Sequence, residues 1–231
     1  MFQRFTSNFS SFFPFITPKQ PINNNVNAIP AEKGIYAAAV DGNRGELEKL
    51  IEQDKQRANG HNRLHCTPLM CTISVDYSDD AERRSKQYEA FCYLWDCTTN
   101  KEQADKAHNN VAFYAAQKGF SEAFELIIPY AEENDFSLLT QLNAQGKNIL
   151  MIAIEYNRVE IVERLSRLHS DIVKSLLMHH DNNDQSIVDY SRDCGNIEIE
   201  ALVTTMLATN NLPAAEDDSW RIKRCSSIPR L

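Results

Sequence analysis

One stretch near the middle of the chain, residues 143–165, most constrains the fold because it contains a complete helix–turn–helix unit. Leu150, Ala153 and Ile154 are spaced so that they lie on one face of a helix. Asn157 interrupts the pattern, and asparagine tolerates a left-handed turn better than most residues. A second apolar stripe is formed by Ile161, Val162, Leu165 and Leu168. Two short amphipathic helices cannot bury their apolar faces alone, so this unit predicts stacked neighbours on both sides.

Copies of the unit are present along most of the chain. With Ala153 as the anchor, the equivalent position of every copy holds a small residue, as close helix packing requires. The anchors are Ala38, Thr72, Ala115, Ala153 and Ser191, which are 34, 43, 38 and 38 residues apart. Four anchors are followed four positions later by Gly or Asn, namely Gly42, Gly119, Asn157 and Gly195. This recurrence predicts a solenoid in which each repeat packs on its neighbours.

A period in the thirties with a small residue in the first helix resembles the ankyrin repeat. Thr67-Pro68-Leu69 matches the T-P-L core of the family motif, with Thr67 placed to cap the helix and Pro68 at its first position. The departures are Asn110, Asn148 and Ser186 in place of that Thr, and Met70 in place of His. The resemblance covers about residues 31–210 and implies an all-α fold, an α-solenoid of about five ankyrin-like helix–turn–helix repeats.

The second repeat carries an insertion. Its interval to the next anchor, 43 residues, exceeds the ankyrin period by about ten. The surplus lies in residues 74–87, which are polar and of mixed charge, and we expect the second helix of the repeat to follow them. The apolar stripe of that helix is formed by Tyr88, Phe91, Cys92 and Trp95. Insertions in repeat proteins map to loops on one face, often the binding face.

The links and ends of the array have their own patterns. Two long links are expected to pack as extra turns, through Phe136, Leu138, Leu139 and Leu142 in one and Ile172, Val173, Leu176 and Leu177 in the other. In the last repeat Glu198 and Glu200 are expected to face solvent, as a terminal repeat requires. Residues 1–30 form a Phe- and Asn-rich leader, of which residues 9–16 are expected to dock as a partial cap. Residues 211–231 are expected to be a disordered tail.

Charge and hydropathy exclude several classes of partner. The 231 residues include 24 basic and 32 acidic ones, a formal net charge of −8, whereas a nucleic-acid binder would want a basic stripe. The same balance argues against adsorption to anionic membranes. No apolar run approaches the length of a transmembrane helix. The Phe-rich N-terminus contains Pro14 and lacks a small-residue cleavage site, which argues against a signal peptide.

The cysteines predict a reducing environment. They are scattered without a C-x-x-C pair, at Cys66, Cys71, Cys92, Cys97, Cys194 and Cys225. Zinc ligands usually come as tighter pairs, so a zinc site from Cys66, Cys71 and the nearby His61 and His65 is the weaker alternative. We interpret the cysteines as reduced structural thiols, which indicates a cytoplasmic location.

The sequence offers little for catalysis. Cys66 stands beside His65, and His179 precedes His180 and Asp181, but adjacent residues on a helix do not face one another. There is no phosphate-binding glycine loop and no H-E-x-x-H motif. We therefore predict no enzyme, no cofactor and no metal. A Cys–His hydrolase assembled in space from distant residues stays the alternative.

The resemblance implies a monomeric module that binds another protein, without nucleic acid or membrane. Ankyrin-type stacks present turn tips and first helices as a concave surface. The candidate partner-binding residues, from these tips and from the insertion, are Asn62, Arg63, Tyr77, Arg83, Arg84, His108, Asn109, Gln145, Lys147, Asn182, Asn183 and Gln185.

A second hypothesis comes from the C-terminus. Degenerate repeats with an insertion and an acidic, then small and polar, C-terminus resemble bacterial effectors that are translocated into a host cell. Such a protein would bind or modify a host protein in the host cytosol. Arg224 stands three residues before Ser227 and Pro229 two after it, which resembles a motif read by phosphoserine-binding proteins. Ser226 and Ser227 are therefore candidate phosphorylation sites.

Overall fold

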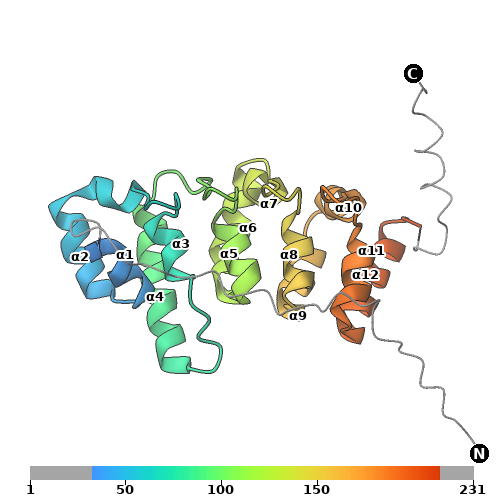
Figure 1. The fold of residues 1–231 in the computed structure, drawn as a ribbon, viewed down its shortest axis with the longest axis horizontal. Coiled ribbons are helices and arrows are strands. Elements are labelled where there is room, and N and C mark those ends of the chain that lie inside the picture. Colours follow the sequence, from blue (N-terminus) through green and yellow to red (C-terminus); the bar gives the residue numbers. More distant parts are fainter. Residues whose placement is uncertain (1–32, 214–231) are drawn as a thin grey trace, which may run out of the picture.

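The computed structural model describes residues 33–213, and these form an elongated stack of paired helices (Figure 1). Within this part of the chain the only β pairing is an isolated bridge between His180 and Ser186. The expected all-α solenoid of five helix pairs is confirmed. No helix of residues 33–213 is long and apolar enough to cross a membrane.

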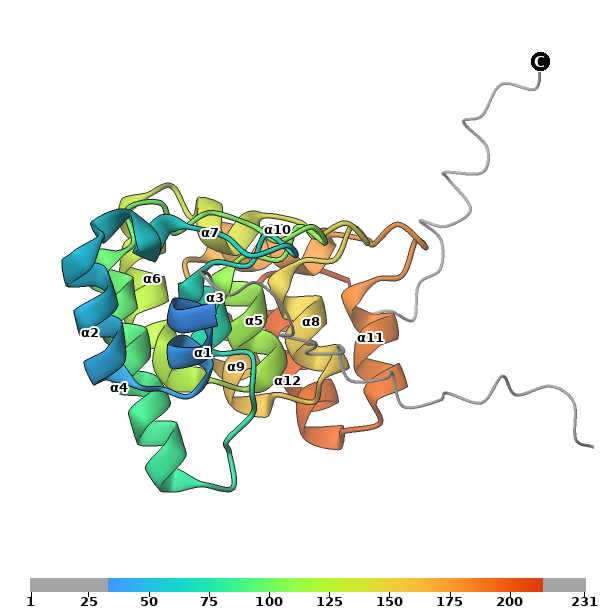
Figure 2. The same ribbon diagram turned by 60° about the vertical axis from the view of Figure 1, so that its left-hand side comes forward.

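Five repeats account for ten of the α-helices. The pairs are α1 (Lys33–Val40) with α2 (Arg44–Gln53), α3 (Pro68–Thr72) with α4 (Ala81–Cys97), α5 (Val111–Lys118) with α6 (Phe124–Glu133), α8 (Ile149–Glu155) with α9 (Val159–Ser166), and α11 (Ile187–Cys194) with α12 (Ile197–Thr209). The first helices form one layer and the second helices the layer behind it (Figure 2). Two short 3₁₀ helices, η1 (Lys55–Asn59) and η2 (Ser121–Ala123), and the link helices α7 (Ser137–Thr140) and α10 (Ser170–Met178) complete the stack.

The anchor positions lie in the core. All five of them are buried, and in α8 every residue from 149 to 154 is buried. The chain then turns through a residue with positive φ, at Gly42, Gly119, Asn157 and Gly195. Small anchors let the first helices of neighbouring repeats approach closely, and the left-handed residue reverses the chain toward the second helix. The repeat register derived from Ala153 is therefore the one that the structure has.

The insertion is half loop and half helix, which corrects the expectation that α4 begins after it. α4 begins at Ala81, so residues 81–87 extend the helix by almost two turns and only residues 73–80 form a loop. Asp80 caps this extension by accepting a hydrogen bond from the Arg83 N–H (3.0 Å), and Lys86 pairs with Glu82 (2.6 Å). A polar run of mixed charge is compatible with the solvated face of a helix as well as with a loop. Here the cap at Asp80 fixes the start of the helix.

The insertion packs on the repeats instead of projecting freely. Gln87 is buried, and its amide donates to the carbonyls of Thr72 (2.7 Å) and Val75 (2.8 Å), which closes the loop onto α4. Asp76 in the loop accepts a hydrogen bond from Arg158 in the fourth repeat (2.9 Å). The insertion is thereby joined to the fourth repeat, and it lies at the lower edge of the stack in Figure 1.

The two link helices pack largely as expected. Leu138 and Leu139 are buried in α7, and Val173, Leu176 and Leu177 are buried in α10. Leu142 is 42% exposed, contrary to expectation, because α7 ends at Thr140 and leaves it in the following turn. In the last repeat Glu198 and Glu200 are exposed, as expected. The leader, the C-terminus that resembles bacterial effectors, and Ser226 and Ser227 lie outside the described residues.

Candidate functional site: a ledge of four fingers

A tight turn of five residues, here called a finger, precedes the first helix of each repeat from the second to the fifth. The fingers comprise residues 62–66, 105–109, 143–147 and 181–185. Each begins with an Asn or Asp whose Oδ1 accepts hydrogen bonds from the backbone N–H groups two and four residues later, over 2.8–3.0 Å. The first residues are Asn62, Asp105, Asn143 and Asp181. One side chain therefore fixes each finger from within.

The fourth residue of every finger has a left-handed backbone. These residues are His65, His108, Gly146 and Asp184, with φ between 60° and 72°. At Gly146 a side chain has no room, because a Cβ atom there would collide with Asn182 of the next finger. The fold thus holds three non-glycine residues in a conformation that only glycine adopts freely, which the internal hydrogen bonds make tolerable.

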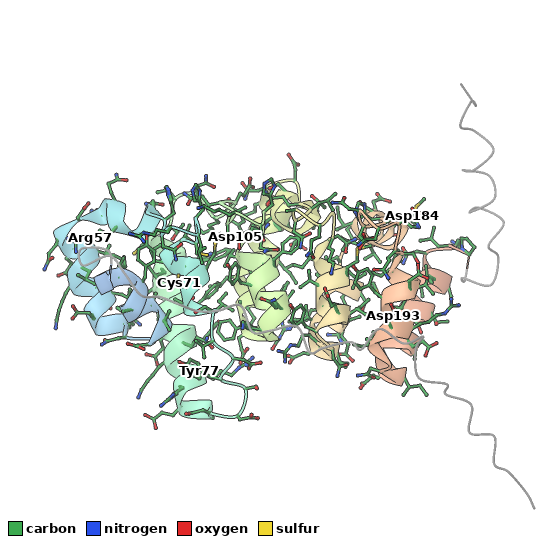
Figure 3. All side chains as sticks on the ribbon, viewed as in Figure 1. Arg57, Cys71, Tyr77, Asp105, Asp184 and Asp193 are labelled. Atoms are coloured by element: carbon green, nitrogen blue, oxygen red, sulfur yellow. The ribbon has the colours of Figure 1, made fainter. Side chains whose placement is uncertain are left out.

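Backbone hydrogen bonds join the fingers into one continuous edge, here called the ledge. Lys106 donates to the Leu64 carbonyl (3.1 Å), Ala144 to that of Ala107 (2.8 Å), and Asn182 to that of Gln145 (3.0 Å). Figure 3 shows Asp105 and Asp184 on this edge and Tyr77, from the insertion, on the opposite edge. The ledge is therefore a single surface, and the insertion is not part of it.

The predicted binding residues divide between these two edges. The ledge brings together eight of them, Asn62, Arg63, His108, Asn109, Gln145, Asn182, Asn183 and Gln185. Asn62 is half-buried and its side chain is occupied in holding its own finger. Arg63, His108, Gln145 and Asn183 are exposed, and within residues 33–213 their side chains form no hydrogen bond or ion pair.

Lys147 is not an exposed tip residue, which corrects the sequence-based expectation. Its side chain is only 7% exposed, and its Nζ lies 2.6 Å from Glu155 Oε2 and 5.2 Å from the centre of the Tyr190 ring. As the last residue of its finger, Lys147 is directed toward α8 and covered by α11 of the next repeat. A partner at the ledge cannot reach it without breaking this buried pair.

The three predicted residues of the insertion lie away from the ledge, and one of them, Arg84, joins two repeats. Arg84 is a bidentate partner of Glu122, with Nε at 2.7 Å from Oε1 and Nη2 at 2.6 Å from Oε2, and it also donates to the Gly119 carbonyl (2.9 Å). Arg83 is exposed, pairs with Asp80 and lies over the Tyr77 ring. The structure therefore does not bring Tyr77, Arg83 and Arg84 together with the fingers.

The polar groups beneath the ledge contact one another and stabilise the fold. Tyr114 donates to Asp105 Oδ2 (2.9 Å) and lies 3.1 Å from the Cys66 sulfur, and burial raises the pKa of that thiol. A raised pKa keeps Cys66 protonated at neutral pH, the opposite of what a nucleophilic cysteine requires. The ring of the adjacent His65 stacks on His61, with ring centres 4.7 Å apart. Within the described residues no three His, Cys, Asp or Glu side chains are grouped as metal ligands.

Sequence reasoning missed the residues that build the fingers. Asp105, Asn143 and Asp181 were given no role in the turns, although each stands five positions before the residue that caps the following helix. The caps themselves do more than begin a helix. Asn110 donates through Nδ2 to the Leu138 carbonyl of α7 (2.9 Å), and Asn148 does the same to the Leu176 carbonyl of α10 (2.8 Å). The departures from the family motif at these caps therefore anchor the link helices.

The comparison with known families agrees with this architecture. Residues 80–189 match the family model of ankyrin repeats, in three copies. The matched segment runs from the start of α4 into α11 and includes three of the four fingers. No curated protein matches the chain. Ankyrin repeats generally act as protein–protein interaction modules, and residues 80–189 of this chain are a segment of such repeats.

Proposed function

We propose that this chain is a non-enzymatic module that binds another protein through the ledge and the adjoining first helices. The observation that carries the proposal is the set of exposed side chains on the ledge, Arg63, His108, Gln145 and Asn183, which the fold itself does not use. The polar groups that do hold the fingers lie beneath the surface. Side chains that the fold does not occupy, on a continuous and exposed edge, are available to a partner.

Rigidity of the ledge supports the same proposal. Each finger is fixed by its own Asn or Asp side chain, and neighbouring fingers are joined by backbone hydrogen bonds. A surface that is ordered before binding loses less conformational entropy when the partner docks. A cytoplasmic location forms part of the proposal and is supported by the five cysteines of residues 33–213, all of which are free.

Affinity capture with matched variants tests the proposal. The ledge variant combines Arg63→Ala, His108→Ala, Gln145→Ala and Asn183→Ala, and the control combines Gln53→Ala, Ser85→Ala, Glu89→Ala and Thr204→Ala, four exposed changes on the second helices. Proteins retained by the wild type and by the control are expected to be lost from the ledge variant, with the same melting temperature for all three. Retention of the same proteins by the ledge variant would contradict the proposal.

A further inference from the structure

Two neighbouring fingers carry positive charges that have no partner. Arg63 and Lys106 are both exposed, and no ion pair among the described residues involves either. The backbone hydrogen bond from Lys106 to the Leu64 carbonyl (3.1 Å) sets the two fingers side by side. The two cations therefore lie on adjoining parts of the ledge.

Many of the other cations among the described residues are ion-paired. Within residues 33–213, ten other Lys and Arg residues lie within ion-pair distance of a carboxylate: Arg44, Lys49, Arg57, Arg83, Arg84, Lys86, Lys147, Arg158, Arg164 and Arg167. The chain has an excess of acidic residues, with a net charge of −8, so carboxylates are plentiful. Among the cations without a carboxylate, Arg63 and Lys106 are set apart by their position on adjoining fingers. No ion pair within residues 33–213 accounts for them.

No carboxylate of these two fingers lies within ion-pair distance of either cation. Asp105 is the only acidic residue of these two fingers, and its oxygens accept hydrogen bonds from the backbone of its own finger and from Tyr114. Leu64, next to Arg63, is 53% exposed and adds an apolar side chain to the same surface. The other exposed titratable side chains here are those of His61, His65 and His108. The patch thus combines free cations with one exposed aliphatic group.

We infer that the fingers of the second and third repeats bind an acidic segment of a partner protein, with an apolar side chain of that segment packed on Leu64. This inference rests on the proposed function and names the chemistry of the partner. Carboxylates on the segment pair with the Arg63 guanidinium and the Lys106 ammonium, and such complementary charges guide association and fix register. A nucleic acid is disfavoured, because two cations on a molecule of net charge −8 would not offset the repulsion of a phosphate backbone.

A display library of random peptides tests the inference on the whole chain. Selection is run on the wild type, on Arg63→Glu/Lys106→Glu, and on Lys49→Glu/Arg167→Glu, a charge-matched control at two exposed positions away from the fingers. Peptides selected on the wild type and the control are expected to be rich in Asp and Glu around an apolar residue. This enrichment is expected to disappear on the finger variant. The best acidic peptide should bind that variant about tenfold more weakly and lose affinity as salt is raised.

The outcomes separate this inference from the proposed function. A pool without acidic enrichment, or the same pool on the finger variant, overturns the inference even where affinity capture still depends on the ledge. Displacement of the acidic peptide by a single-stranded oligonucleotide at equal concentration also overturns it, because the fingers would then bind polyanions in general. Failure to select any peptide on the wild type overturns it as well, whereas the proposed function is decided separately by the capture experiment.

Discussion

At the scale of single residues, each finger depends on one Asn or Asp. Asp181 accepts hydrogen bonds from the N–H groups of Asn183 and Gln185 and from the Tyr190 hydroxyl. Burial alone would raise the pKa of Asp181, but these donors hold it below its usual range. The ionised side chain is therefore bound more favourably in the folded protein than in water, so its charge contributes to stability.

The first prediction concerns Asp181. Asp181→Ala leaves three donors without their acceptor and should lower the free energy of unfolding by about 1–3 kcal/mol, measured by urea denaturation. Asp181→Asn retains an acceptor but not the charge. Because the folded pKa is lowered, the advantage of wild type over Asp181→Asn should be full above about pH 5 and shrink as the pH falls through the folded pKa. An advantage that grew on acidification would contradict this assignment.

The second prediction concerns the cap at Asn148. Thr at this position would match the family motif and could still cap α8, yet its shorter side chain lacks the amide group that Asn148 uses to donate to the Leu176 carbonyl (2.8 Å). We expect Asn148→Thr to destabilise by about 1–3 kcal/mol, because a buried acceptor loses its partner. Ser186→Thr is the matched control, since Ser186 makes only the local capping box. Equal melting temperatures for both variants would show that the hydrogen bond from Asn148 to α10 does not contribute to stability.

At the scale of elements, the insertion joins two repeats that are not neighbours in the stack. The pair between Asp76 and Arg158 spans 82 residues and connects the second repeat to the fourth. Arg158 also donates to the Gln117 carbonyl of α5 (3.0 Å). In an ordinary solenoid each repeat interacts only with its neighbours. The insertion therefore adds a connection that such an array lacks.

The third prediction is a double-mutant cycle on this connection. Asp76→Ala, Arg158→Ala and the double variant should give a coupling energy of about 0.5–1 kcal/mol, because both side chains are partly shielded from water. The control cycle uses Glu163 and Arg167, whose side chains are 40% and 74% exposed, and should give a coupling near zero. A coupling no larger than that of the control would mean that the insertion merely lies against the fourth repeat.

The helix pairs could be predicted from the sequence because their determinants are local. Small anchors such as Ala153 and turn residues such as Asn157 act within one repeat. The start of α4 could not be predicted from the sequence, because a mixed-charge run is compatible with both loop and helix, and the cap at Asp80 is what makes it helical. The burial of Lys147 could not be predicted either, because the Tyr190 ring that covers it belongs to the next repeat. The structure places the predicted tips before the first helices, but sequence reasoning missed the residues that shape them.

At the scale of the whole molecule, the connection between distant repeats bears on cooperativity. Stacks with only nearest-neighbour contacts can unfold in parts, whereas longer-range contacts favour unfolding as a unit. Here the insertion links the second repeat to both the third, through Arg84 and Glu122, and the fourth. We therefore expect these three repeats to unfold together.

The fourth prediction tests this cooperativity. In a Trp220→Phe background, Trp95 is the remaining tryptophan and reports on the second repeat, while circular dichroism reports on all helices. Urea transitions by the two probes should coincide. With Asp76→Ala and Arg84→Ala added, the Trp95 transition should move to lower urea than the dichroism transition. Coincident transitions in that variant would contradict a role of the insertion in coupling the repeats.

The central claim is that this protein binds its partner through the ledge. Hydrogen exchange measured on the chain alone and in complex with a captured partner tests it most directly. We expect slowed exchange in the fingers, at residues 62–66, 105–109, 143–147 and 181–185, and unchanged exchange in residues 73–80 on the opposite edge. Protection confined to residues 73–80 or to the second helices, with the fingers unchanged, would contradict the claim.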